Sequence, residues 1–358
     1  MFDLYFPTLA ATAAAFLFSF SLTFFAKQTA RQIGAIDVPG EARRMHDHPI
    51  PRTGGIAVYL TFLVATALFC SASPALFALW TGGCLLFLTG LIDDVFSISV
   101  GVRLAAQTTA ALIATLGGKA TLTGSGDAWS VLVSTLTIVA LTNAHNFIDG
   151  IDGLCAKIGI TEAVAIGVLF LLGNDPGDAF PVFLLATALA GFLPLGHAPA
   201  RLFLGDCGST PTGYLLASFA LLATGNSRTE TALPAGALTV LTPLLIFSVP
   251  LADLALAILR RVTSAESPFE PDRRHLHHLL VDAGYSHEDA GAMLVTLAVL
   301  SALIGISCRV ETLLPFASAG CVAASLLLLW IWKRMSVRRH AHRLRRRLSN
   351  PAAGNFLG

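Results

Sequence analysis

Residues 75–92 read ALFALWTGGCLLFLTGLI, and the overlapping stretch 88–99, LTGLIDDVFSIS, ends this apolar run with Asp93 and Asp94. The 18 residues of the run include no charged side chain. An α-helix rises about 1.5 Å per residue, so about 20 apolar residues cross a hydrocarbon layer of about 30 Å. The stretch therefore predicts a membrane-spanning helix with a pair of carboxylates at its C-terminal end.

Apolar runs of similar length recur on both sides of this one and predict eleven spans in all. Of the 358 residues, 54% are apolar and only 13% are charged, whereas soluble proteins have about 25% charged residues. The runs are continuous rather than alternating, which excludes a β-barrel and predicts an all-α polytopic integral membrane protein. The fourth span is the weakest, because Arg103 and Gln107 lie inside it. The spans are expected at residues 5–26, 54–73, 75–92, 100–118, 128–148, 154–172, 179–196, 209–224, 234–259, 290–308 and 312–332.

The basic residues predict the orientation. When Lys and Arg are assigned to alternate sides of these spans, 20 fall on one side and 3 on the other. Cytoplasmic loops carry the excess of Lys and Arg, so we place the N-terminus outside and the C-terminus in the cytoplasm. Residues 1–332 then form a single transmembrane domain, and 333–358 form a basic cytoplasmic tail. The cytoplasmic loops are expected at 27–53, 93–99, 149–153, 197–208 and 260–289.

Four polar motifs, far apart in the sequence, fall on this cytoplasmic side. The first two are also explained by polar, solvated helix ends, and the glycine-rich turn around Asp206 is weak evidence when taken alone. Their convergence on one membrane face, however, indicates a functional site. The motifs are Asp93 and Asp94 after the third span, Asn143, Asn146, Asp149 and Asp152 in LTNAHNFIDGIDGL (141–154), Asp206 in RLFLGDCGSTPTG (201–213), and His275, His277 and His278 in SPFEPDRRHLHHLL (267–280).

The spacing within two of these motifs favours ligand binding. The polar residues of the second motif, from Asn143 to Asp152, recur every third residue, which predicts one stripe along a helix. Gly150 and Gly153 would let a ligand or another backbone approach this stripe closely. The glycine-rich turn around Asp206 leads into a helix, and such a turn can offer backbone N–H groups to a phosphate.

The histidine motif has two interpretations. His275 and His278 lie three residues apart and share a face if the loop is helical there. Zinc is one ligand for such a cluster, but no cysteine lies near and carboxylates dominate the other motifs. We therefore favour contact with an anionic ligand, assisted by Arg273 and Arg274. Carboxylates, phosphate-binding turns and basic residues together suit Mg²⁺ and a phosphorylated substrate, because Mg²⁺ prefers oxygen ligands and substrate phosphates.

In this order and at these span ends, the motifs resemble the polyprenyl-phosphate N-acetylhexosamine-1-phosphate transferase family. The resemblance covers nearly the whole chain and rests on five features of the sequence. They are the Gly54-Gly55 pair that opens the second span, the Asp93-Asp94 pair, NxxNxxDGxDGL from Asn143 to Leu154, the GD.GS turn at 205–209, and the histidine loop.

The resemblance implies that the domain is catalytic and moves a sugar-1-phosphate from a UDP-sugar to a membrane polyprenyl phosphate, releasing UMP. It implies Mg²⁺, which Mn²⁺ can replace, on Asp206 and Asn146. Asp93 is expected to engage the lipid phosphate, with Asp94 beside it, and direct attack by this phosphate is favoured over an aspartyl nucleophile. The other catalytic residues are Asp149 and Asp152 on the nucleotide side, and His275, His277 and His278 near the diphosphate or sugar. The remaining residues expected to bind substrate are Asn143, Gly205, Ser209, Arg273, Arg274, Lys27, Arg43 and Arg44. For Lys27, Arg43 and Arg44, a role only in setting the topology is the alternative.

The histidine loop also bears on the sugar. Its PDR-x-H-x-HH arrangement looks like the GlcNAc-1-phosphate transferase branch, because Leu276 interrupts the three consecutive histidines of the muropeptide branch. The donor is then UDP-GlcNAc and the acceptor undecaprenyl phosphate, in the inner membrane of a bacterium, for an O-antigen-like envelope polysaccharide. The phospho-MurNAc-pentapeptide transferase and related sugars such as GalNAc remain alternatives. Monomer and homodimer are both left open, and a net charge of +1 argues against nucleic acid as a partner.

A membrane carrier is the alternative from a different class. Carriers also contain intramembrane carboxylates and broken helices. Their binding groups, however, lie near the bilayer midplane and often within internal repeats. Here the polar motifs lie at span ends on one face, and no repeat is found, so we favour the enzyme.

Overall fold

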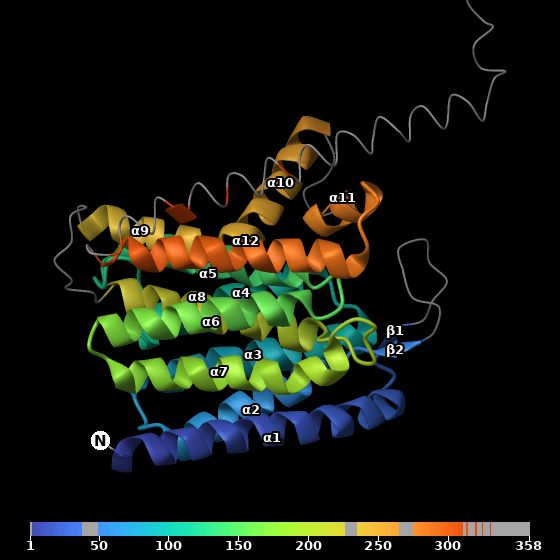
Figure 1. The fold of residues 1–358 in the computed structure, drawn as a ribbon, viewed down its shortest axis with the longest axis horizontal. Helices are drawn as coiled ribbons and strands as arrows, with labels where there is room; N and C mark the ends of the chain where they lie inside the picture. The colour runs from blue at the N-terminus through green and yellow to red at the C-terminus, as the bar shows by residue number, and fades with distance from the viewer. Residues whose placement is uncertain are drawn as a thin grey trace, which may run out of the picture.

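The computed structural model describes residues 2–37, 49–225, 235–264 and 275–310, with a few single positions beyond. Long helices lie side by side in a bundle, with a small sheet at one end (Figure 1). The elements are α1 (Phe2–Ile33), β1 (Ile36–Asp37), β2 (Ile50–Pro51), α2 (Gly54–Phe69), α3 (Pro74–Phe96), α4 (Val100–Leu112), the π-helix η1 (Ile113–Gly117), α5 (Ala128–Ile148), α6 (Leu154–Leu172), α7 (Pro176–Gly196), α8 (Asp206–Gly225), α9 (Ala235–Ile246), α10 (Ser248–Ser264), α11 (Leu276–Asp282) and α12 (His287–Ser307).

The helices confirm a polytopic membrane protein. Within the described ranges, seven helices are long and apolar enough to cross a membrane, and the bent α9–α10 pair is an eighth candidate. Each of the first ten predicted spans coincides with one or two of the helices. The eleventh, 312–332, lies outside the described residues except for single positions, as does the tail at 333–358. The total of eleven and the sidedness of the termini therefore stay predictions.

The ninth span is not the single continuous helix predicted at 234–259. It is broken into α9 and α10, which meet at an angle of 86°. Phe247 separates the two helices. Pro250 explains the break, because proline has no N–H to donate to the carbonyl of Ile246, four residues earlier. In Figure 1, α10 turns away from the bundle at this point.

Glycines bring three helices into close contact at one end of the bundle. A Cβ on Gly55 of α2 would lie 2.2 Å from the backbone nitrogen of Gly208, and one on Gly90 of α3 would lie 2.4 Å from the carbonyl oxygen of Asp206. Small residues at helix interfaces let backbones pack directly against each other in membranes. The first turn of α8 is therefore held between α2 and α3.

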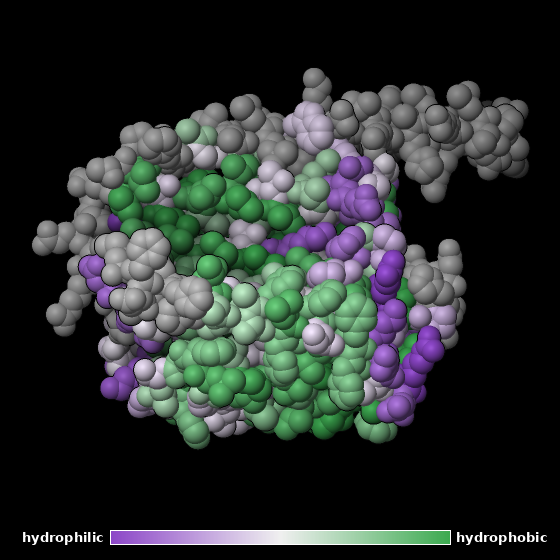
Figure 2. Space-filling view, turned by 60° about the horizontal axis from the view of Figure 1, so that its bottom comes forward, coloured by the Kyte–Doolittle hydropathy of each residue, from purple (hydrophilic) through white to green (hydrophobic). Residues whose placement is uncertain are grey.

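The small sheet fixes the loops next to this contact. Strands β1 and β2 are antiparallel, with Ile36 opposite Pro51. The loop before α8 continues this pairing, since Phe203 donates to the carbonyl of Pro51 and Gly54 donates to the carbonyl of Phe203. Arg52, the residue after β2, is thereby placed beside the start of α8. Figure 2 shows hydrophobic residues across the middle of one face and hydrophilic residues at both ends of it, with the larger group at this end of the bundle.

Candidate active site

The carboxylate of Asp94 caps the first turn of α8. It accepts hydrogen bonds from the backbone N–H groups of Asp206 and Cys207, at 3.0 Å each, and its side chain is fully buried. The first N–H groups of a helix have no partner within the helix, so a carboxylate there is stabilising. Gly205 lies just before the helix and has a left-handed backbone conformation, with φ +75°. The turn at 205–209 was expected to offer its amides to a phosphate, but here the carboxylate of Asp94 accepts the amides of residues 206 and 207.

Asp149 brings a further carboxylate to this point. It follows the last residue of α5 and its side chain faces Asp94 and Asp206. Burial raises the pKa of the Asp149 carboxyl well above its usual range, and repulsion from Asp206 adds to the shift, whereas Arg52 opposes it. The site thus concentrates negative charge.

Two arginines partly compensate this charge. Arg52 Nε lies 3.7 Å from Asp94 Oδ1. Arg103 Nη1 lies 3.1 Å from Asp93 Oδ2 and 3.8 Å from Asp206 Oδ2, so one guanidinium joins α3 to α8. Burial alone would lower the pKa of Arg52, but the surrounding carboxylates, above all Asp94, outweigh it and raise the pKa. The two arginine side chains are still 38% and 37% exposed, so both guanidinium groups can be reached from outside the cluster.

Asn146 connects α5 to α8. Its Nδ2 donates to Asp206 Oδ1 at 2.8 Å and to Ser209 Oγ at 3.1 Å. Asn143, one turn earlier, instead exchanges hydrogen bonds with the amide of Gln107 on α4. The two asparagines therefore face different neighbours. A small pocket beside them is lined by Leu86, Thr89, Gly90, Asp93, Arg103, Gln107, Asp206 and Thr210.

The histidines lie on and just before the short helix α11. His275 Nδ1 is 2.7 Å from Asp253 Oδ2, and Asp253 Oδ1 accepts the N–H of Leu276. His277 faces the turn after α5, since a Cβ on Gly150 would lie 2.5 Å from His277 Nε2. Burial lowers the pKa of His277 to about 3, so this imidazole is neutral near pH 7. The structure thus places the histidine motif against the turn at residues 149–153, the DGxDG turn.

Other predicted site residues lie apart from the cluster or outside the described residues. Asn143, Asn146, Asp149 and Asp152 do not form one helical stripe, because α5 ends at Ile148. Asp152 accepts the N–H of Ala200 in the loop after α7, at 2.8 Å. Lys27, near the end of α1, has no ion pair with another described residue. Arg43, Arg44, Arg273 and Arg274 lie outside the described residues.

Sequence reasoning missed several residues that complete the cluster. Gln107 counted only as a weakness of the fourth span, and Arg103 counted as that weakness and toward orientation. The polar residues inside this span were the signal that α4 faces polar partners. Arg52 counted only toward orientation. Asp253 gave no signal, because its partner His275 is 22 residues away in the sequence.

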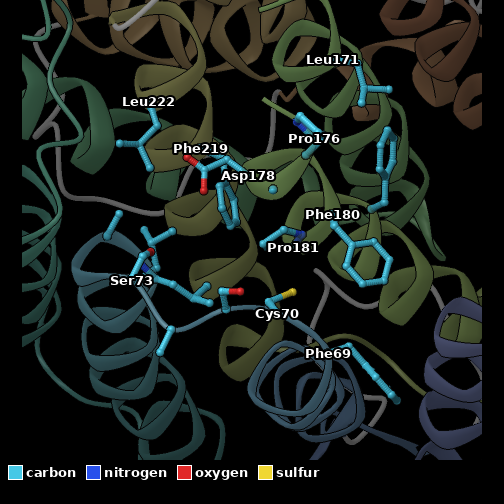
Figure 3. Close-up of a pocket in the computed structure, with 18 of the residues that line it drawn as sticks. Phe69, Cys70, Ser73, Leu171, Pro176, Asp178, Phe180, Pro181, Phe219 and Leu222 are labelled. Carbon is cyan, nitrogen blue, oxygen red and sulfur yellow. The ribbon is translucent and has the colours of Figure 1, made fainter. Parts of the chain in front are cut away.

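A cavity of about 750 Å³ lies at the other end of the bundle. Its lining includes Ser73 at the start of α3, Leu171 at the end of α6 and Pro176 at the start of α7. Figure 3 shows it ringed by phenylalanine, leucine and proline side chains, with Asp178 among them. It is therefore separate from the acidic cluster, which lies at the opposite ends of the same helices.

The fold and the cluster together define a polytopic membrane protein with an acidic, arginine-containing site at one end of its helix bundle. The model of glycosyl transferase family 4 matches residues 76–224. The undecaprenyl-phosphate alpha-N-acetylglucosaminyl 1-phosphate transferase of Escherichia coli (strain K12) is 32% identical over 315 residues, which cover 84% of this chain and 83% of that protein. The decaprenyl-phosphate N-acetylglucosaminephosphotransferase of Mycobacterium tuberculosis (strain ATCC 25618 / H37Rv) is 34% identical over 74% of each chain. The chain therefore belongs to glycosyl transferase family 4, which confirms the resemblance drawn from its motifs.

Proposed function

We propose that this protein transfers N-acetylglucosamine-1-phosphate from UDP-GlcNAc to undecaprenyl phosphate and releases UMP. The reaction would take place at the cytoplasmic face of a bacterial inner membrane and begin an envelope polysaccharide of the O-antigen kind. One observation carries the proposal. Four carboxylates meet Arg52 and Arg103 at one end of the bundle: Asp93 and Asp94 from the end of α3, Asp149 from the turn after α5, and Asp206 from the start of α8.

The chemistry needs alignment and charge compensation more than a protein nucleophile. An oxygen of the lipid phosphate attacks the phosphorus that carries the sugar, and the bond from this phosphorus to the UMP oxygen breaks, with its electron pair leaving on UMP. A phosphate monoester is already ionised near neutral pH, so the attack requires no general base. Asp93 and Asp94 are engaged by arginines and backbone N–H groups, which disfavours either as a covalent nucleophile.

The donor set suits Mg²⁺. In the described residues, no group of three or more His, Cys, Asp or Glu side chains is arranged to hold a metal ion. Mg²⁺ does not require one, because it is commonly held by one or two carboxylates together with waters and substrate phosphates. We assign Asp206 and the amide oxygen of Asn146 as the ligands. The carboxylates of the cluster outnumber its arginines, and this excess negative charge would attract the cation. When bound, the ion would neutralise negative charge on the transferred phosphoryl group.

The arginines and histidines have different tasks in this scheme. Arg103 lies between Asp93 and Asp206, where a substrate phosphate would meet a positive charge. His277 is neutral and buried against Gly150, so its contribution is to hold α11 on the DGxDG turn. His275 is oriented by Asp253 in the same region.

The test is to incubate purified protein in nanodiscs with undecaprenyl phosphate, Mg²⁺ and a panel of UDP-sugars, and to follow UMP and labelled lipid. We expect UDP-GlcNAc to be used, EDTA to stop turnover, and Mg²⁺ or Mn²⁺ to restore it. Asp206→Ala should insert normally and lose transfer. Use of UDP-MurNAc-pentapeptide alone would assign the protein to peptidoglycan synthesis, and recovery with Zn²⁺ alone would contradict the magnesium assignment. Substrate transport without UMP release would contradict the enzyme.

A further inference from the structure

A second buried polar pair lies behind the site and takes no part in the scheme above. His145 of α5 and Glu162 of α6 are both completely inaccessible to solvent, and His145 Nε2 is 2.6 Å from Glu162 Oε2. Ionisable side chains inside a membrane-spanning bundle are costly, and they mark functional elements by default. Replacing such a pair by apolar residues is often neutral or stabilising, so stability alone does not explain its presence.

Both ring nitrogens of His145 are engaged. Nδ1 lies 2.8 Å from the carbonyl oxygen of Leu141, one turn earlier in α5. A carbonyl only accepts, so Nδ1 carries a hydrogen and donates it. The imidazole is thus anchored to its own helix at one edge and to Glu162 at the other. The second carboxylate oxygen, Glu162 Oε1, is buried without a hydrogen-bond partner.

The pair lies where the site-bearing helices cross. In the described residues it is the one side-chain hydrogen bond that joins α5 to α6. A Cβ on Gly213 of α8 would lie 2.9 Å from His145 Cβ, so α8 passes directly over the imidazole. The ring of Phe247, at the break between α9 and α10, contacts His145 edge to face with the ring centroids 5.9 Å apart.

The next residue after His145 is Asn146, whose Nδ2 reaches Asp206 and Ser209 on α8. Rotation of the last turn of α5 would move Asn146 off these partners, and the His145–Glu162 bond opposes that rotation. We propose that His145 and Glu162 form a positioning pair that aims Asn146 at Asp206 and so sets the affinity of the site for a divalent cation. This inference rests on the proposed function.

The test uses Mn²⁺ as the probe, with purified protein in nanodiscs. Mn²⁺ binding is measured by electron paramagnetic resonance without substrates, alongside thermal stability and steady-state transfer. The variants are Glu162→Gln, Glu162→Leu and the double variant His145→Leu/Glu162→Leu. A matched control is Thr115→Val/Thr135→Val, which removes a different buried polar pair, two hydroxyls, one of them on α5.

If the pair positions Asn146, the variants should differ from one another in their affinity for Mn²⁺. The double variant should keep its melting temperature, but its Kd for Mn²⁺ should rise about 10-fold or more, as for other residues that orient metal ligands. The Mg²⁺ concentration for half-maximal rate should rise by the same factor, while KM for the UDP-sugar at saturating Mg²⁺ stays within about twofold. Glu162→Gln should retain nearly normal affinity, because its side-chain amide can donate to His145 Nε2. The threonine control should match the unmodified protein.

Several results would overturn the inference. One is a double variant that is stable and keeps the Mn²⁺ affinity and the Mg²⁺ dependence of the unmodified protein. In that case His145 and Glu162 would only contribute to packing. Another is Glu162→Gln as impaired as Glu162→Leu, because positioning by a hydrogen bond predicts rescue. If the unmodified protein neither binds Mn²⁺ nor transfers sugar phosphate, the proposed function fails and this inference fails with it. Normal turnover in the unmodified protein with unaffected variants overturns the positioning role alone.

Discussion

At the scale of single residues, Asp94 acts on the backbone of another helix rather than on bulk solvent. Its Oδ1 accepts from Asp206 N and its Oδ2 accepts from Cys207 N. The side chain that carries these bonds is fully buried. Asp94 therefore holds Asp206 in place, whereas Asp93, paired with Arg103, lies closer to the exposed part of the cluster.

Asp94→Asn should lower transfer by about 10- to 100-fold, as expected for a residue that orients ligands. The asparagine side chain has one acceptor oxygen where aspartate has two. Its NH₂ group would face a backbone N–H of α8, and that N–H would lose its acceptor. We expect the free energy of unfolding to fall by about 1.5–3 kcal/mol, the range for hydrogen bonds to charged groups. The transfer rate and the thermal unfolding of the variant are both measured on protein in nanodiscs. Asp178→Asn, at the opposite end of the bundle, is the control, and an Asp94→Asn variant with full activity would refute the role.

His277 should make the protein sensitive to acid. Its pKa is about 3 in the folded protein, because burial disfavours the charged imidazole, against about 6.5 in an unfolded chain. Between these values the unfolded chain binds the proton and the folded protein does not. Stability from this residue is therefore complete above pH 6.5 and falls by about 1.4 kcal/mol per pH unit below it. His278, His275, His287 and Asp253 face the same imidazole, so the comparison is between variant and unmodified protein.

The measurement for this residue is a set of thermal melts at pH 7.5, 6.5 and 5.5. His277→Gln should lose less stability on acidification than the unmodified protein, so that the two curves converge at low pH. His197→Gln, in an exposed loop, should keep the original slope. Parallel curves for His277→Gln and the unmodified protein would show that His277 does not contribute.

At the scale of helices, the site depends on how closely α3 approaches α8. Gly90→Ala would push a Cβ to 2.4 Å from the Asp206 carbonyl oxygen, and backbone cannot yield as a flexible side chain does. We expect a loss of about 1–3 kcal/mol, as for overpacking elsewhere, with loss of transfer because Asp206 moves. Gly101→Ala, on α4, is the matched control, since no atom lies within 4 Å of its added Cβ. A Gly90→Ala variant with normal stability and rate would contradict the close contact.

At the scale of the whole molecule, continuous apolar runs predicted the helices well, because a span in lipid must satisfy its backbone internally. The α9–α10 break escaped prediction, since one proline in an apolar run is tolerated in many membrane helices. The acidic cluster was foreseen from Asp93, Asp94, Asp149 and Asp206 falling on one side. Arg52, Arg103 and Asp253 were not, because each depends on a partner brought close only by folding. The pairing of the Asp206 and Cys207 amides with Asp94 was missed for the same reason.

The whole-molecule prediction is that the two ends of the bundle face opposite sides of the membrane, with the acidic cluster inside. His197 follows α7 at the end where Ala200 meets Asp152, and Gly126 precedes α5 at the other end; both are exposed. In intact cells, a membrane-impermeant maleimide should label Gly126→Cys at once and His197→Cys only after permeabilisation. The unmodified protein gives the background from its native cysteines. Labelling of His197→Cys from outside would place the aspartates away from cytoplasmic nucleotide, and a nucleotide-sugar could then not be the donor.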